Sequence, residues 1–182
     1  FADTYDLNKG SVDILAEGGK QYITQWEDKD NNLCVKDDKG EIRNRLDDDI
    51  TLTTKNETTD ETETTDKTKP TSNTVTIDAE KGNTAKVTLD NVNIDVYGSS
   101  KAALTVTGDG NTEIELNGDN TLISGRGHAG LEKADDVSHG SLTIKDDLNN
   151  NGSKKEEGQP GDVGSLNVVG NVELPSSLSK RI

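Results

Sequence analysis

The chain has 182 residues, of which 28% are hydrophobic and 3% aromatic, and it carries a formal net charge of −15. This composition excludes a thick globular core, and the negative charge disfavours nucleic acid and anionic membrane surfaces as partners. A secreted or surface-displayed protein that is kept soluble by its charge fits both properties. The sequence begins at Phe1 and lacks methionine, so we expect a fragment of a longer protein whose signal peptide and anchor lie outside it.

Residues 1–49 are predicted to form an N-terminal cap with entry strands. Residues 5–15 suggest a hairpin-like entry, and Gly18 and Gly19 turn the chain into a second aromatic segment. Most of the aromatic residues lie in this part, which favours packing of a cap over ligand contact. The functional alternative is stacking on sugar rings by Tyr22, Trp26 and Tyr97.

Cys34 is the single cysteine, so an intrachain disulfide is excluded. Its neighbours Leu33 and Val35 favour a small buried residue. Residues 55–72 follow soon after and consist almost entirely of Thr, Glu, Asp and Lys, with Pro70. They offer no apolar side chain to pack, which predicts a disordered surface loop.

A repeat organises the stretch from Lys86 to Lys133. Residues 86–91 align with residues 113–118, and residues 102–106 align with residues 129–133, both 27 positions later. Apolar residues alternate with polar ones in each copy, which is typical of a strand with one buried face. Such short strands bury their apolar faces only by stacking on one another.

The repeat predicts an all-β fold, a right-handed parallel β-helix with about three short strands per coil. A β-sandwich is the alternative, although it does not need self-similarity at a fixed offset. We expect the β-helix to span residues 50–174, with long polar loops at 55–72 and 146–163, and a C-terminal tail at 175–182. Leu142 and Ile144 then correspond to Ile114 and Leu116, and the same phrase returns at Leu166 and Val168.

The loop at 146–163 is the first place to look for function, since insertions in solenoids often gather on the binding face. Asp147, Asn149 and Asn151, followed by Gly152, resemble the first half of a calcium loop. The twelfth position is Gly158, where a bidentate carboxylate is needed. A solvated turn is therefore favoured over a metal site, and calcium is the single candidate cofactor.

Catalytic chemistry finds little support in the sequence. His128 and His139 lie among glycines at turn-like positions, where an ordinary turn role is favoured. β-Helical polysaccharide lyases use calcium-binding carboxylates and a basic residue, but here the basic residues of the repeat are scattered singly along the chain. These residues are Lys86, Lys101, Arg126, Lys133 and Lys145. We expect no enzyme activity.

Four phrases of the repeat region resemble β-helical domains of large cell-surface proteins of gut Firmicutes, some of which are catalogued as carbohydrate-binding domains. The phrases are KVTLDNVNI (86–94), ELNGDNTL (115–122), GHAGLE (127–132) and GSLTI (140–144). The resemblance covers about residues 74–171. Relatives often continue into glycine-rich turns after the position of Val169, which this chain does not do.

The resemblance implies a non-catalytic binding or display module, secreted or anchored at the cell surface. Three hypotheses remain open. The first is an adhesin that binds a host protein, with an immunoglobulin variable domain as one candidate because some surface proteins of gut Lachnospiraceae bind these domains as superantigens. The second is a carbohydrate-binding module, and the third is a stalk without a ligand. The oligomeric state does not follow from the sequence.

Overall fold

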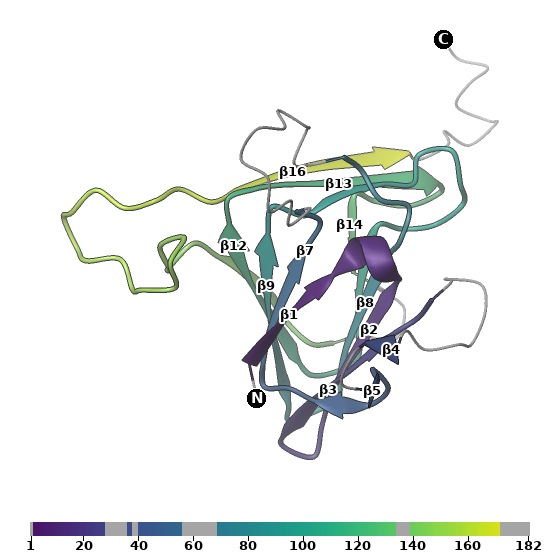
Figure 1. Cartoon of the computed structure of the whole chain (residues 1–182), viewed down its shortest axis with the longest axis horizontal. Helices are drawn as coiled ribbons and strands as arrows, with labels where there is room; N and C mark the ends of the chain where they lie inside the picture. Colours follow the sequence, from purple (N-terminus) through teal and green to yellow (C-terminus); the bar gives the residue numbers. More distant parts are fainter. Residues whose placement is uncertain (1, 28–35, 38–39, 56–68, 134–138, 172–182) are drawn as a thin grey trace, which may run out of the picture.

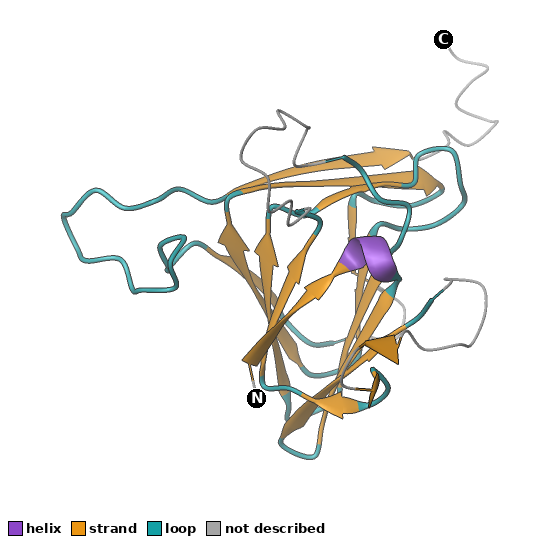
Figure 2. Ribbon diagram, in the orientation of Figure 1, coloured by secondary structure: helices purple, strands orange, loops and turns teal. Residues whose placement is uncertain are grey.

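The computed structural model describes residues 2–27, 36–37, 40–55, 69–133 and 139–171. The protein is all-β, and its sheets are mostly parallel (Figure 2). One 3-10 helix, η1 (Leu7–Lys9), interrupts the strands near the N-terminus. No helix in the described residues is both long enough and apolar enough to cross a membrane. The predicted all-β class is therefore confirmed.

Three sheets build the body of the protein (Figure 1). The five-stranded sheet is parallel throughout and contains, in order, β1 (Ala2–Asp6), β7 (Asp49–Thr53), β9 (Thr84–Asp90), β12 (Asn111–Asn117) and β15 (Leu142–Lys145). The six-stranded sheet contains β14 (Leu131–Lys133), β11 (Leu104–Thr107), β8 (Val75–Ala79), β2 (Val12–Glu17), β3 (Lys20–Gln25) and β6 (Arg45–Leu46). The three-stranded sheet contains β10 (Asn93–Asp95), β13 (Asp119–Arg126) and β16 (Ser165–Asn171). A separate small pair consists of β4 (Lys36–Asp37) and β5 (Gly40–Glu41).

From β8 onward, successive strands belong to the six-stranded, the five-stranded and the three-stranded sheet in turn, and this order occurs three times. Within each sheet, the strands from consecutive rounds pair in parallel. Val87 on β9 lies opposite Ile114 on β12, and Leu104 on β11 lies opposite Leu131 on β14. Both pairs are 27 residues apart, so the structure confirms that the sequence repeat corresponds to neighbouring parallel strands.

The predicted correspondence of the next strand is wrong by two residues. Ile144 pairs with Ile114 rather than with Leu116, and Leu142 pairs with Thr112. A shift of two residues leaves each side chain on the same face of the strand, so the apolar pattern is equally satisfied by both registers. Leu166 is not equivalent to Leu142 either, because it lies in the three-stranded sheet opposite Asn120.

The N-terminal entry is also different from the hairpin that the sequence suggests. β1 and β2 lie in different sheets, where they pair in parallel with β7 and β8. The hairpin follows instead, between β2 and β3, and its turn contains Gly18 and Gly19 at φ +59° and +73°. Glycine adopts these left-handed conformations without the steric cost that a Cβ brings. Beyond β2 in the six-stranded sheet, β3 pairs antiparallel with β2, and β6 pairs antiparallel with β3.

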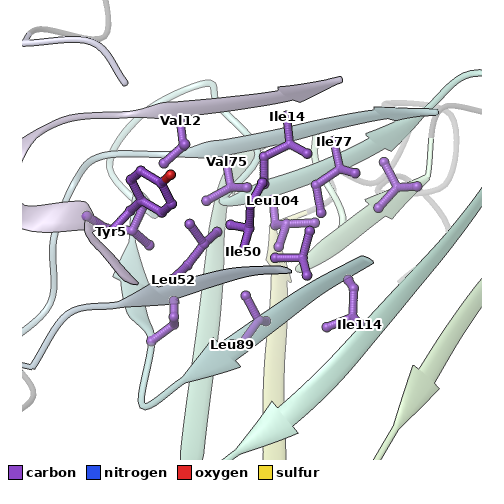
Figure 3. Packing of buried hydrophobic residues seen from close by; sticks show 14 of the residues in the cluster. Tyr5, Val12, Ile14, Ile50, Leu52, Val75, Ile77, Leu89, Leu104 and Ile114 are labelled. Atoms are coloured by element: carbon purple, nitrogen blue, oxygen red, sulfur yellow. The ribbon is translucent and has the colours of Figure 1, made fainter. Parts of the chain in front are cut away.

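The core is a thin layer between the sheets (Figure 3). Alternate residues of each strand point inward, as the period of two requires. Ile50, Leu52 and Leu89 of the five-stranded sheet are fully buried, as are Ile77 and Leu104 of the six-stranded sheet. This arrangement explains how a chain with few hydrophobic residues still builds one continuous core.

A buried asparagine helps to align the turns between the five-stranded and three-stranded sheets. Asn120 Oδ1 accepts a hydrogen bond from Val92 N at 2.8 Å, and Asn120 Nδ2 donates to the carbonyl oxygens of Asn117 and Ser165. One side chain thus ties three neighbouring segments together. Buried backbone groups at a turn need such partners, because an unpaired polar group is costly away from water.

Candidate functional site

A groove of about 710 Å³ lies over the outer face of the five-stranded sheet. Its floor comes from β7, β9, β12 and β15, and its wall comes from the segment between β15 and β16, which extends away from the body in Figure 1. This segment is the polar loop that the sequence singled out. The residues lining the groove are Asp49, Lys86, Val87, Thr88, Glu113, Glu115, Lys145, Asp146, Asp147, Leu148, Lys154 and Lys155.

Apart from the buried Val87, the floor consists of outward-facing residues that the strand register aligns across the sheet. Lys86 on β9 lies directly opposite Glu113 on β12. Lys145 on β15 lies opposite Glu115 and forms an ion pair with Glu113, with 3.0 Å between Lys145 Nζ and Glu113 Oε1. The hydrogen bond with Glu113 raises the pKa of Lys145 above its usual range. Opposite charges on adjacent strands stabilise this register.

Glu115 attaches the loop to the floor. Its Oε1 atom accepts hydrogen bonds from the backbone N–H groups of Asp147 and Leu148, at 2.8 and 2.7 Å. Charge-assisted hydrogen bonds of this kind are stronger than neutral ones. The loop therefore leaves β15 in a direction that is fixed by a side chain of the neighbouring strand.

A second ion pair holds the two ends of the loop. Lys155 Nζ lies 2.7 Å from Asp146 Oδ1, and Gly164 N donates to the same oxygen at 3.1 Å. The hydrogen bond from Lys155 holds the pKa of the Asp146 carboxyl below its usual range. The start, middle and end of the loop thus meet at one carboxylate.

Two of the three predicted calcium ligands, Asn149 and Asn151, accept hydrogen bonds within the loop through their side-chain oxygens. Asn149 Oδ1 accepts from Asp162 N at 3.1 Å, and Asn151 Oδ1 accepts from the backbone and hydroxyl of Ser153 at 3.0 and 2.7 Å. Asp147 lines the groove. In the described part of the chain, no three His, Cys, Asp or Glu side chains are grouped as a metal site requires. Calcium binding by Asp147, Asn149 and Asn151 stays a prediction.

The charges in the groove are nearly balanced. Its lining contains four lysines and five carboxylates, whereas the whole chain has a formal net charge of −15. Lys86, Lys145, Lys154 and Lys155 come from three separate parts of the sequence. The fold therefore gathers basic residues that the sequence shows only singly, and most of the acidic excess lies outside the groove.

The aromatic residues predicted to bind a ligand do not lie together. Tyr97 follows β10, is 55% exposed and lines a hollow of about 560 Å³ with Ser99, Ser100 and Arg126. Tyr22 and Trp26 are partly buried on and just after β3, which lies between β2 and β6 in the six-stranded sheet. Trp26 Nε1 donates to Asp13 Oδ2 at 2.8 Å.

The histidines have separate environments. His128 Nδ1 lies 2.9 Å from Glu132 Oε2, and His128 Nε2 lies 3.0 Å from the carbonyl oxygen of Ser100. His139 is exposed, and its backbone N–H donates to Asp109. No contact between the two histidines is found among the residues that the structure describes. Cys34 and most of the loop at 55–72 lie outside the described residues.

No known family model, curated protein or solved structure matches this chain. The groove, its charges and its loop therefore carry the functional interpretation. One signal in the sequence points to the groove. The 27-residue alignment places Lys86 over Glu113, and opposite charges on neighbouring parallel strands mark a polar outer face.

Proposed function

We propose that the three sheets are the faces of a right-handed parallel β-helix. The regular order of visits to the sheets and the parallel pairing at 27 residues support this architecture. Right-handed connections are favoured because crossovers between parallel strands of one sheet are almost always right-handed. Each coil then contributes one strand to each face.

We further propose that the protein is a non-catalytic, cell-surface binding module that recognises a host protein through the groove. The observation that carries this proposal is the charge balance of the groove within a strongly acidic chain. A protein partner needs a contiguous strand face on which like charges do not dominate, because uncompensated charges at an interface are costly. The groove offers such a face, with lysines and carboxylates interleaved.

An immunoglobulin variable domain is the first partner to test. Its choice rests on the resemblance of the repeat to gut surface proteins. The floor of the groove is made of regular strands, and the loop is tied to it through Glu115 and Asp146. Such a preorganised surface loses little conformational entropy on binding.

Carbohydrate binding is the second candidate, and the exposed ring of Tyr97 favours it. The ring borders a hollow lined by two serines and Arg126, which could supply hydrogen bonds to sugar hydroxyls. An exposed aromatic face is suited to stacking on a sugar ring. A stalk without a ligand is the remaining alternative.

The test is a binding screen of the chain against host serum and mucosal proteins, including immunoglobulins, and against immobilised glycans, with and without calcium. Lys86→Glu and Lys145→Glu reverse charges on the floor of the groove. Lys81→Glu is the matched control, because Lys81 is exposed in the turn between β8 and β9 and does not line the groove. We expect a protein hit that both groove variants weaken and Lys81→Glu preserves.

Other outcomes contradict the proposal in distinct ways. Equal binding by the groove variants and the control shows that the partner uses another surface. A glycan hit that Tyr97→Ala abolishes favours the carbohydrate module. Binding that depends on calcium assigns Asp147, Asn149 and Asn151 to a calcium site. If neither host proteins nor glycans bind, the stalk is favoured.

A further inference from the structure

The inward-facing side chains of the last three strands are exposed at one end of the sheets. Ile144 and Val168 are 40% and 47% exposed, whereas their partners Ile114 and Leu122 on the preceding strands are fully buried. Leu131, Leu142 and Leu166 share this position and are partly buried against the core. We name the surface formed by Leu131, Leu142, Ile144, Leu166 and Val168 the end face.

Three strand edges surround the end face. β14, β15 and β16 are each the last strand of their sheet, and their outer edges pair with no strand in the described part of the chain. An open edge presents unpaired N–H and C=O groups beside apolar side chains, which favours addition of another strand. The opposite end of the six-stranded sheet differs, since β3 and β6 run antiparallel beyond β2.

The charges of these strands suit self-association. Together, β14, β15 and β16 carry one glutamate and two lysines, in a chain with a formal net charge of −15. Two copies that meet at the end face therefore bring apolar groups together without opposing clusters of carboxylates. The three strands themselves therefore add no acidic excess to the contact.

We propose that the end face binds a second copy of this chain, in a two-fold dimer whose edge strands pair antiparallel. A two-fold axis that is perpendicular both to the stacking direction and to an edge strand reverses that strand in the partner, and antiparallel pairing is at least as stable as parallel pairing. Such an interface is isologous, so one surface patch is complementary to itself. The dimer leaves the groove on the outer face of the five-stranded sheet open, so this proposal is independent of the proposed function.

Sedimentation velocity of the intact chain over micromolar to millimolar concentrations tests the dimer. We expect a concentration-dependent dimer that added salt strengthens, because salt screens the repulsion between two acidic bodies. Ile144→Lys and Val168→Lys place a charge in the contact and should each weaken dimerisation about tenfold or more. Val163→Lys is the matched control, since Val163 is 77% exposed in the loop before β16 and does not belong to the end face.

Hydrogen exchange of the wild-type chain at low and high concentration supplies a readout that does not depend on the variants. Backbone amides on the outer edges of β15 and β16 should exchange more slowly as the dimer forms. A chain that stays monomeric throughout overturns the proposal. A dimer that Val163→Lys weakens as much as Ile144→Lys does, or whose edge amides exchange at unchanged rates, overturns it as well.

Discussion

Tyr5 on β1 donates a hydrogen bond from its hydroxyl to Asp47 Oδ2 at 2.7 Å, and both side chains are buried. Asp47 Oδ1 accepts a second hydrogen bond, from Asp49 N at the start of β7. Burial and the hydrogen bond with Asp47 raise the pKa of Tyr5 well above its ordinary value. The first strand of the chain is thus attached to the segment that leads into its neighbour, 42 residues away.

Tyr5→Phe should lower the free energy of unfolding by about 1–3 kcal/mol, because it removes a donor from a buried carboxylate. Urea unfolding at neutral pH measures the change. Tyr22→Phe is the control, since the Tyr22 ring is partly exposed and its hydroxyl has no hydrogen-bond partner in the described part of the chain. Its effect should stay within about 0.5 kcal/mol. Equal effects of the two variants would contradict the role of Asp47.

Ile114→Ala should cost about 2–5 kcal/mol, as expected for a fully buried branched side chain that leaves a cavity. Its cross-strand neighbour Ile144 is 40% exposed, so Ile144→Ala should cost clearly less. Denaturant titrations of both variants at a concentration where the chain is monomeric provide the comparison. A larger cost at Ile144 would show that the end face is covered within a single chain.

Gly110→Ala should destabilise the protein strongly, although the substitution adds only one methyl group. A Cβ at Gly110 would collide with the backbone carbonyl oxygens of Glu80 and Asn83, where neighbouring turns stack closely. Gly98→Ala is the control, because a Cβ there meets no atom within 4 Å. Thermal unfolding should show a marked loss for Gly110→Ala and almost none for Gly98→Ala. A neutral Gly110→Ala would mean that these turns lie further apart.

The ion pair between Asp146 and Lys155 should make the loop sensitive to acid. Because its hydrogen bond with Lys155 lowers the Asp146 pKa in the folded state, the pair contributes stability above the ordinary value of 3.8. That contribution is lost as the pH falls through the lowered folded-state pKa. Carboxyl-carbon NMR should show Asp146 titrating below 3.8 in the wild type and closer to it in Lys155→Gln. Titration at or above 3.8 in the wild type would refute the pairing.

Alternation of apolar and polar residues was enough to predict strands within the repeat, and self-similarity was enough to predict that β9 pairs with β12 and β11 with β14. The pairing of Val87 with Ile114 follows directly from the 27-residue offset. The offset failed at β15, where Ile144 rather than Leu142 pairs with Ile114. Both residues face the core, so hydrophobicity alone cannot distinguish registers that differ by two residues.

The candidate site was predictable in part. The polar loop at 146–163 was singled out by its composition, and it forms one wall of the groove. The floor was not predicted, because Lys86, Glu113 and Lys145 lie far apart in the sequence and meet through strand register. For the aromatic residues, the sequence indicated a chemistry but not their positions in the fold. Their chemistry suggested ligand binding, but Tyr97 lies in the turn after β10, whereas Tyr22 and Trp26 lie on and just after β3 of the six-stranded sheet.

Because the strands of the five-stranded sheet pair in parallel and in register, the outward-facing side chains on its outer face form a regular array, a lattice of rows across the strands. Neighbouring strands lie about 4.8 Å apart, and outward side chains recur about every 6.6 Å along each strand. Thr51, Thr88 and Glu115 occupy one row of this lattice, each flanked along its strand by buried residues that hold it in place. Side chains in such a row can be exchanged without disturbing the interior, so the face can acquire new chemistry one position at a time while the scaffold keeps its spacing.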